Sequence, residues 1–208
     1  MDFSTFFSKQ ARKPSGFFGR YVMSAIFNIG NAYLNRFVSE LLSVQPNDHV
    51  LDIGCGTGKL IYHLALQIND GYFEGIDFSD TMVSLAEKRN RKNIVAGRVN
   101  IKEADFNKLS YESNIFDKCS SVNTLYFWPE PEVTAHKIAD ILKPGGIFVV
   151  AFEDIKQLAQ RNLNKDVFRL YSVDDVKNLL ASSGFSGDIR QASRRKGKQT
   201  FHCVVAQK

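Results

Sequence analysis

Short apolar runs alternate with longer segments of helical periodicity from about residue 48 to the end of the chain. Brief runs rich in Val, Ile and Phe are typical of buried strands, whereas apolar residues three or four positions apart are typical of helices. We expect strands at 49–53, 72–77, 99–103, 116–122, 147–152, 187–192 and 200–206. We expect helices at 59–68, 80–91, 131–142 and 173–180, the second and fourth capped by Ser79 and Ser172.

This order of elements predicts the fold class. Strands that alternate with helices form a mostly parallel sheet, because right-handed crossovers place each helix on a face of the sheet. The last two strands flank the basic turn 194–198 and form a hairpin, so the final strand is antiparallel. We therefore expect an α/β fold, a three-layer α-β-α sandwich around a seven-stranded, mostly parallel sheet with an antiparallel last strand.

Residues 1–45 have a different texture, rich in Phe and in basic side chains. Between residues 19 and 42 the apolar positions recur at helical spacing, and they are Val22, Ile26, Ile29, Tyr33, Phe37 and Leu41. Pro46 and Asn47 end the pattern. We expect one or two amphipathic helices here, and we divide the chain into a helical cap over 1–45 and a main domain over 46–208.

Composition excludes several classes of protein. The chain has 208 residues, of which 44% are hydrophobic, so it can bury a core without disulfides. The three cysteines form no C-x-x-C pair, which argues against a disulfide framework or a metal cluster and favours the reducing cytoplasm. No apolar run is long enough for a membrane span, and we expect no secretory signal. The net charge of +5 fits a solvated basic surface.

The residues with the clearest chemistry follow the first strand, in the sequence VLDIGCGTG at 50–58. Glycines let a loop turn sharply and approach a ligand, and open α/β sheets bind ligands at the carboxyl ends of their strands. A P-loop and a dinucleotide fingerprint would both require glycine at position 59, where this chain has Lys59. What is left is a G-x-G-x-G loop preceded by Asp52.

The chain at this point resembles the class I S-adenosylmethionine-dependent methyltransferases, and the resemblance covers roughly residues 46–152. VLDIGCGTG matches the first motif of that family. The resemblance implies a Rossmann-like sheet and S-adenosyl-L-methionine as cofactor, with S-adenosyl-L-homocysteine as product. It also implies that the amino-acid part of the cofactor contacts Asp52 and the loop residues Gly54, Cys55, Gly56 and Gly58.

Two further matches follow the second and third predicted strands. Asp77 stands 19 residues after Gly58, a distance that suits an acid accepting hydrogen bonds from ribose hydroxyls. In the family the next residue, here Phe78, lies against the adenine, and Met82 would face the same ring. The family also has an acid after the third strand that binds the adenine amino group. The resemblance gives that role to Asp105, with the backbone amide of Phe106 beside it.

The fourth strand should end near Asn123, beside the methyl-bearing end of the cofactor. We take Asn123 as a further cofactor residue and Thr124 as a substrate contact on the same side. Tyr126 and Trp128, with Phe127 between them, either form a wall of the substrate pocket or cover the following helix. No histidine stands in a pattern that identifies a base, so we assign no catalytic residue, and we expect no metal.

These residues predict methyl transfer by in-line displacement to a small-molecule acceptor of aromatic, quinone or lipid-like character. A nucleic-acid partner is not expected, because Thr124 and Leu125 replace the Pro-Pro pair of DNA amino-methyltransferases. Three alternatives stay open: a non-catalytic cofactor-binding subunit, an RNA or protein methyltransferase, and an NAD-dependent oxidoreductase. Residues 1–45 would either pack on the sheet or contact an apolar substrate or a membrane surface. We expect a monomer or a homodimer.

Overall fold

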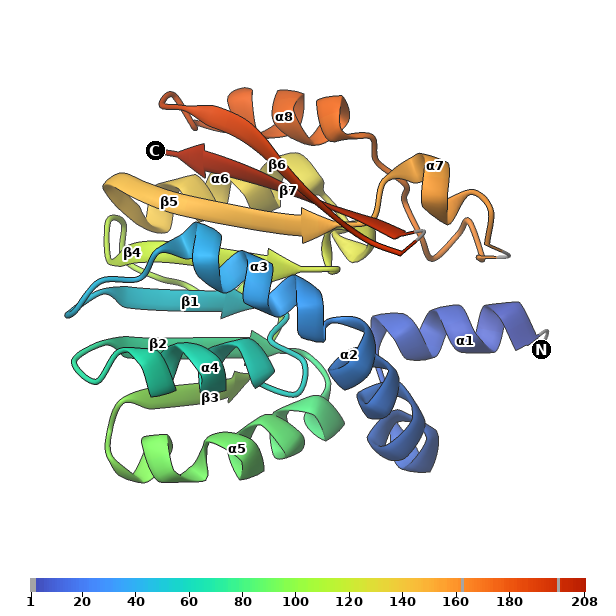
Figure 1. Ribbon diagram of the computed structural model, residues 1–208, viewed down its shortest axis with the longest axis horizontal. Coiled ribbons are helices and arrows are strands. Elements are labelled where there is room, and N and C mark those ends of the chain that lie inside the picture. The colour runs from blue at the N-terminus through green and yellow to red at the C-terminus, as the bar shows by residue number, and fades with distance from the viewer. Residues whose placement is uncertain (1–2, 162, 198) are drawn as a thin grey trace.

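The computed structural model describes residues 3–161, 163–197 and 199–208. Its centre is one seven-stranded sheet with the strand order β3-β2-β1-β4-β5-β7-β6 (Figure 1). The strands are β1 (His49–Ile53), β2 (Tyr72–Asp77), β3 (Val99–Glu103), β4 (Phe116–Val122), β5 (Leu142–Phe152), β6 (Ile189–Lys196) and β7 (Gln199–Gln207). The first five pair in parallel, and β7 pairs antiparallel with both β5 and β6. The predicted fold class is confirmed.

Helices cover both faces of the sheet (Figure 1). The α-helices are α1 (Phe3–Arg12), α2 (Ser24–Gly30), α3 (Ala32–Leu42), α4 (Lys59–Gln67), α5 (Asp80–Val95), α6 (Pro131–Ile141), α7 (Ile155–Leu158) and α8 (Val173–Ala181). Three short elements complete the fold: the π-helix η1 (Phe18–Met23) and the 3-10 helices η2 (Phe106–Lys108) and η3 (Leu125–Phe127). Within the described residues no helix is long and apolar enough to cross a membrane.

The core lies on both sides of the central strands. Helices α3, α4 and α5 pack on one face, and α6 and α8 pack on the other. The run Phe148–Phe152 of β5 is completely buried, as expected for a central strand covered on both faces. Ser172 caps α8 through a capping box with Asp175, as its position in the sequence predicted.

The amino-terminal helices differ from the sequence pattern. Helix α3 buries Phe37 against the sheet, together with Leu34, Val38 and Leu42. The earlier positions of the predicted stripe, Val22, Ile26 and Ile29, are exposed instead. The π-helix η1 has an extra residue per turn, and Asn31 separates α2 from α3, so one periodicity does not run through residues 19–42.

Strand β5 begins earlier than the predicted strand 147–152. It includes residues 143–146, which the predictions left between a helix and a strand, and its pairing with β4 changes register between Phe116 and Lys118. Gly145 has φ +78° within this segment, a left-handed conformation typical of turns. The strand therefore contains an irregularity here and does not break into a separate turn.

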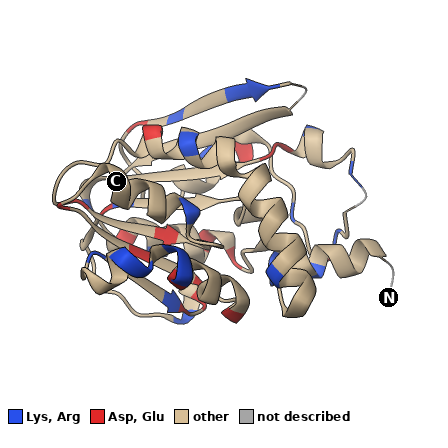
Figure 2. Cartoon of the chain, turned by 60° about the horizontal axis from the view of Figure 1, so that its bottom comes forward, with Lys and Arg blue, Asp and Glu red and all other residues tan. Residues whose placement is uncertain are grey.

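Positive charge gathers at the amino-terminal end of the chain. Residues 3–39 contain five of the 27 basic residues and none of the 22 acidic ones, so the rest of the chain holds 22 of each. Figure 2 shows α1 with blue ribbon and no red. The whole net charge of +5 therefore corresponds to this segment.

Candidate active site

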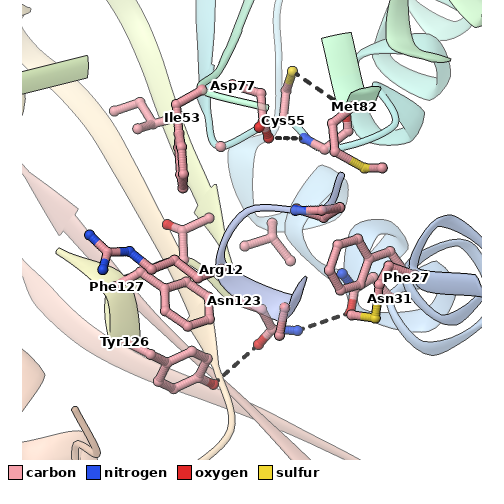
Figure 3. Close-up of a pocket in the computed structure, with 18 of the residues that line it drawn as sticks. Arg12, Phe27, Asn31, Ile53, Cys55, Asp77, Met82, Asn123, Tyr126 and Phe127 are labelled. Carbon is pink, nitrogen blue, oxygen red and sulfur yellow. Dashed lines mark hydrogen bonds between the residues drawn. The ribbon is translucent and has the colours of Figure 1, made fainter. Parts of the chain in front are cut away.

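A cavity of about 470 Å³ opens at the carboxyl ends of β1, β2, β4 and β5 (Figure 3). This is the edge at which open α/β sheets bind ligands, and the size suits a small molecule. The predicted site residues border this cavity with one exception: Asp52, Gly54, Cys55, Gly56, Asp77, Phe78, Met82, Asp105, Phe106, Asn123, Thr124, Tyr126 and Trp128 all line it.

Gly54, Gly56 and Gly58 of the glycine loop all have positive φ, but their surroundings differ. A Cβ on Gly54 would lie 2.4 Å from Cγ2 of Thr124, so the loop and the end of β4 are in close contact. A Cβ on Gly56 would meet no protein atom within 4 Å, because this residue faces the cavity. Gly58 is the exception among the predicted site residues. It packs against Ala86 and begins α4, so its role is structural.

Asp77 holds the loop in place from the end of β2. Its side chain accepts hydrogen bonds from the backbone N–H of Gly56 (2.9 Å) and of Ser79 (2.9 Å). Burial raises the pKa of this carboxyl to about 6, although the two N–H donors and the charge of Lys13 act in the opposite direction. Figure 3 shows the side chain beside Cys55 at the edge of the cavity.

Asp52 is the second buried carboxyl at this edge, only 3% exposed. Its Oδ1 accepts a hydrogen bond from the Ser120 hydroxyl at 2.8 Å. Burial raises its pKa to about 7, and the neighbouring charge of Asp77 adds to the shift. Among the described residues neither carboxyl has a salt bridge. Both are therefore placed to receive a cationic or hydrogen-donating ligand.

The next part of the wall is flat and apolar. Met82, almost fully buried, lies one turn into α5, and Phe78 precedes the cap of that helix. Phe106 is buried in η2, with the Lys137 ammonium 4.7 Å from its ring centroid. Asp105 caps η2 by accepting a hydrogen bond from the N–H of Asn107, and it remains exposed at the rim.

A chain of side-chain hydrogen bonds crosses the cavity beyond the end of β4 (Figure 3). Asn123, in the left-handed region with φ +56°, donates to Oδ1 of Asn31 at 2.9 Å and accepts from the Tyr126 hydroxyl at 3.2 Å. That hydroxyl also accepts from the backbone N–H of Glu153. Thr124 shares a short hydrogen bond with Ser121.

The aromatic residues after β4 have two kinds of contact, with the cavity and with the core. Tyr126, Phe127 and Trp128 line the cavity and belong to the core cluster that includes α6. The rings of Tyr126 and Phe127 pack on Phe168, with centroid distances of 5.8 and 4.8 Å.

The remainder of the wall comes from residues that the sequence analysis did not select. From the amino-terminal helices come Phe7, Ala11, Arg12, Pro14, Met23, Ile26, Phe27, Gly30, Asn31 and Asn35. From the region after β5 come Glu153, Leu158, Arg161, Leu163, Phe168, Gln199 and Phe201. The abundance of Phe in residues 1–45 was the one signal that could have indicated the first group.

Glu153 gives this far wall a polar site. It directly follows β5, is 9% exposed and forms a bidentate ion pair with Arg161. The side-chain amide of Gln199 donates to the same carboxylate at 2.8 Å. The wall that follows β5 therefore has an anion that is already paired, in contrast to Asp52 and Asp77 near the glycine loop, which have no salt bridge among the described residues.

Hydrogen bonds fix the amino-terminal helices over the cavity. The Asn28 side chain accepts from the Thr57 hydroxyl at 2.7 Å and from Arg89 at 3.0 Å, which ties α2 to the glycine loop. The buried Ser8 hydroxyl accepts from the backbone N–H of Asn164 at 3.1 Å. Helix α1 is thereby attached to the segment after α7.

Comparison with known proteins agrees with this geometry. The family model described as a methyltransferase domain matches residues 45–199, most of the chain. The chain belongs to the S-adenosylmethionine-dependent methyltransferase family. The chain is 32% identical to the O-methyltransferase cnsE of Penicillium expansum over 77% of its own length. It is 24% identical to the sterol 24-C-methyltransferase ERG6 of Saccharomyces cerevisiae over 81% of its length. It spans 62% and 47% of the lengths of those two relatives.

A solved structure supports the fold over nearly the whole chain. A chain of the complex between the Haloferax volcanii Trm112 methyltransferase activator and a methyltransferase superposes with a TM-score of 0.77. The alignment covers 99% of both chains at 18% identity. It therefore includes the amino-terminal helices that close the cavity.

Proposed function

We propose that this protein transfers a methyl group from S-adenosylmethionine to an apolar small molecule that carries one polar group. The observation that carries the proposal is the pair of buried carboxyls, Asp52 and Asp77, which border the cavity together with Gly56, whose Cβ position is open. Buried acids without a cation stabilise a bound ligand that supplies positive charge or hydrogen-bond donors.

The residues present fit this cofactor. Asp52 and the N–H groups of the glycine loop suit its amino-acid end, and Asp77 suits the ribose hydroxyls. Met82, Phe78 and Phe106 offer apolar surface for the adenine, with Asp105 at the rim as acceptor for its amino group. When bound, the cofactor supplies a methyl group activated by a sulfonium.

The residues of the chain would bind the cofactor and the acceptor, orient them toward each other and exclude water from the cavity. Its apolar walls keep water from the reacting atoms, which strengthens the electrostatic interactions within the cavity. The hydrogen-bond chain through Asn31, Asn123 and Tyr126 fixes the orientation of polar groups at the boundary between the two halves of the cavity. Polar groups in fixed positions would bind the acceptor in one orientation, with its nucleophilic atom aligned with the methyl group.

The acceptor half favours an apolar molecule with a polar end. Phe7, Phe27, Phe127, Phe168 and other apolar residues surround it, and the pair Glu153–Arg161 supplies one polar site. The names of the two relatives point to methylation at oxygen and at a sterol carbon, and both acceptors are compatible with this wall. The free and buried cysteines fit a reducing compartment such as the cytoplasm.

Calorimetric titration with S-adenosylmethionine, S-adenosylhomocysteine and NAD tests the cofactor. We expect binding of the first two and no heat from NAD. Asp77→Ala should weaken cofactor affinity by about 1.5–3 kcal/mol, roughly tenfold to a hundredfold. The matched control is Glu103→Ala, because Glu103 is an exposed acid at the end of the adjacent strand and does not border the cavity.

Transfer itself is tested with labelled S-adenosylmethionine and a panel of phenols, quinols and sterols. Methylated product supports the proposal. Unchanged affinity in folded Asp77→Ala would contradict the cofactor assignment. Tight cofactor binding with no product from the whole panel would favour the non-catalytic binding subunit.

A further inference from the structure

The outer face of the amino-terminal helices is apolar where an exposed helix face is normally polar. Phe17 and Ile29 are 77% and 78% exposed, and Tyr21 is 58% exposed. With Val22 and Ile26 they form what we call the amino-terminal apolar face, which runs along η1 and α2. Phe17 and Tyr21 pack on each other with a centroid distance of 4.6 Å, so the face includes a ring pair turned to solvent.

This concentration of apolar side chains is particular to one region. Of the ten large apolar side chains recorded as exposed among the described residues, six lie between residues 3 and 29. The other four are separated from one another along the chain, at Leu66, Tyr72, Val95 and Val133. Single exposed apolar residues are ordinary, but a contiguous group marks an interaction surface.

The charge of the same region selects the partner. Residues 3–39 hold five basic side chains and no acidic one, while the remainder of the chain is balanced. Lys9 and Arg20 are exposed close to the apolar face in sequence, while Arg12 borders the cavity and Lys13 lies over the Phe78 ring; in Figure 2 the helix α1 beside the N label has blue segments and no red one. Exposed apolar and aromatic side chains beside basic ones are the combination that binds the interface of an anionic bilayer.

The apolar face continues to the cavity. Ile26 is 42% exposed and also lines the cavity, and Gly30 is likewise both exposed and part of the lining. Arg12 lines the cavity from α1 with an exposed side chain. If this face contacts lipid, the wall of the cavity lies directly behind the contact.

We propose that the amino-terminal apolar face docks on anionic lipid bilayers, with the apolar side chains in the headgroup region and the basic ones at lipid phosphates. Docking on lipid does not depend on methyl transfer. Its consequence, delivery of an apolar acceptor from the bilayer to the cavity, rests on the proposed function. Nucleic acid would not require Val22 or Ile29 at the surface, and a second copy of the chain would meet the same positive charge.

Flotation of the full chain with vesicles tests the proposal. One vesicle type is phosphatidylcholine alone, and the other contains about a third phosphatidylserine. We expect binding to the anionic vesicles, weaker at high salt because screening reduces the attraction of basic residues to lipid. Phe17→Ser/Ile29→Ser should reduce the bound fraction about tenfold or more, since two anchors no longer enter the interface.

The matched control is Leu66→Ser/Val95→Ser, which removes two exposed apolar side chains from other helices and should bind as the unmodified chain does. Lys9→Gln/Arg20→Gln should weaken binding to anionic vesicles, and Arg91→Gln/Lys92→Gln, at the far end of α5, should not. Circular dichroism verifies the fold of each variant.

Three results would overturn the proposal: no binding to either vesicle type, equal binding by the Phe17/Ile29 variant, or equal loss in the Leu66/Val95 control. Light scattering supplies a fourth. A dimer that Phe17→Ser/Ile29→Ser converts to a monomer would assign the face to a subunit contact. Cofactor titration of the same variants separates the two proposals, because none of the residues changed lines the cavity.

Discussion

Carboxyl groups at the two ends of the central strands have pKa values shifted in opposite directions. Toward the amino-terminal ends, Glu74 of β2 is within 2.8 Å of His49 Nε2 and within 2.9 Å of Lys102 Nζ. Burial opposes its ionisation, but the hydrogen bonds from these two partners prevail and lower its pKa. Asp117 of β4 has a lowered pKa for the same reason, through the His49 N–H and Lys143.

At the carboxyl ends, Asp52 and Asp77 are buried with hydrogen-bond donors only, and their pKa values rise. In β1 and β2, Glu74 is therefore an ionised acid with cationic partners inside the protein, whereas Asp52 and Asp77 have no salt bridge among the described residues, and we propose that a ligand supplies their partner. In this sheet the acids at the cavity have raised pKa values and the acids toward the other edge have lowered ones. The direction of the pKa shift therefore distinguishes the two edges better than burial alone.

The largest expected contrast is between Asp52→Asn and Glu74→Gln. Asn keeps an acceptor for Ser120 but loses the charge, so cofactor affinity at pH 8 should fall about a hundredfold, or about 2.7 kcal/mol. The folded-state pKa of Asp52, about 7, is above the ordinary aspartate value of 3.8, so stability falls as the pH rises from about 3.8 to about 7, and the full loss is present at pH 8. Asp52→Asn should therefore raise the melting temperature of the cofactor-free protein at pH 8.

Glu74→Gln should do the reverse. Its folded-state pKa is lowered, so its contribution to stability is present near neutral pH and is lost on acidification. The melting temperature should fall, by the equivalent of roughly 1–2 kcal/mol after allowance for the exposed Lys102, with unchanged cofactor affinity. Calorimetric scans and titrations measure both. Two variants shifting in the same direction would remove the distinction between the ends of the sheet.

Acidification should weaken the cofactor complex. A cationic ligand binds the ionised acids, so protonation of Asp52 below about pH 7 and of Asp77 below about pH 6 competes with binding. We expect affinity to fall at least about tenfold between pH 7.5 and 5.5. Titration in two buffers with different ionisation enthalpies counts the protons released. Asp52→Asn should remove the part of the decline near pH 7; a pH-independent affinity would contradict the assignment of both acids.

A smaller contrast comes from two glycines with similar backbones. Gly56 (φ +54°) and Gly97 (φ +72°) both have open space at the Cβ position, but only Gly56 lines the cavity. Gly→Ala at either position should cost about 1–2 kcal/mol of stability, the strain of a left-handed L-residue. Only Gly56→Ala should also weaken cofactor binding. Equal affinity losses would mean that strain alone, and not occupation of the cavity, is responsible.

The smallest expected effect on cofactor affinity is that of Tyr126→Phe. The hydroxyl accepts the buried N–H of Glu153 and donates to Asn123, so its loss leaves one donor without an acceptor. Stability should fall by about 1–3 kcal/mol, while cofactor affinity should change less than about twofold. Thermal denaturation and titration test the two parts. A large loss of cofactor affinity would place Tyr126 in the cofactor half of the cavity.

The side of the cavity around the glycine loop could be predicted from the sequence because its residues are local to two strand ends. Asp52 and the glycine loop end one strand, Asp77 ends the next, and parallel pairing brings both to one edge. The strands β1 to β4 have the predicted bounds for the same reason, since each is a short buried run. Gly58 alone was assigned to the ligand when packing against Ala86 explains it.

The acceptor half could not be predicted, because it depends on segments that meet only in the folded chain. Nothing local to Phe7 or Arg161 indicates that both border one cavity. The sequence predicted one apolar stripe from Val22 to Leu41, but the helical period does not continue across η1 and Asn31, and the α2 part of the stripe is exposed. Periodicity locates a helix, but it does not determine which face is buried once the turn widens or the helix breaks.

The three cysteines have a practical consequence for labelling. All are buried, and burial raises the pKa of each thiol, to about 12 for Cys203. Thiolates are the species that react with maleimides, so the native thiols should be nearly inert at neutral pH. A single cysteine introduced at an exposed position such as Phe17 would then be the reactive one in an otherwise unaltered chain. A fluorophore attached there would report directly on whether that position enters lipid.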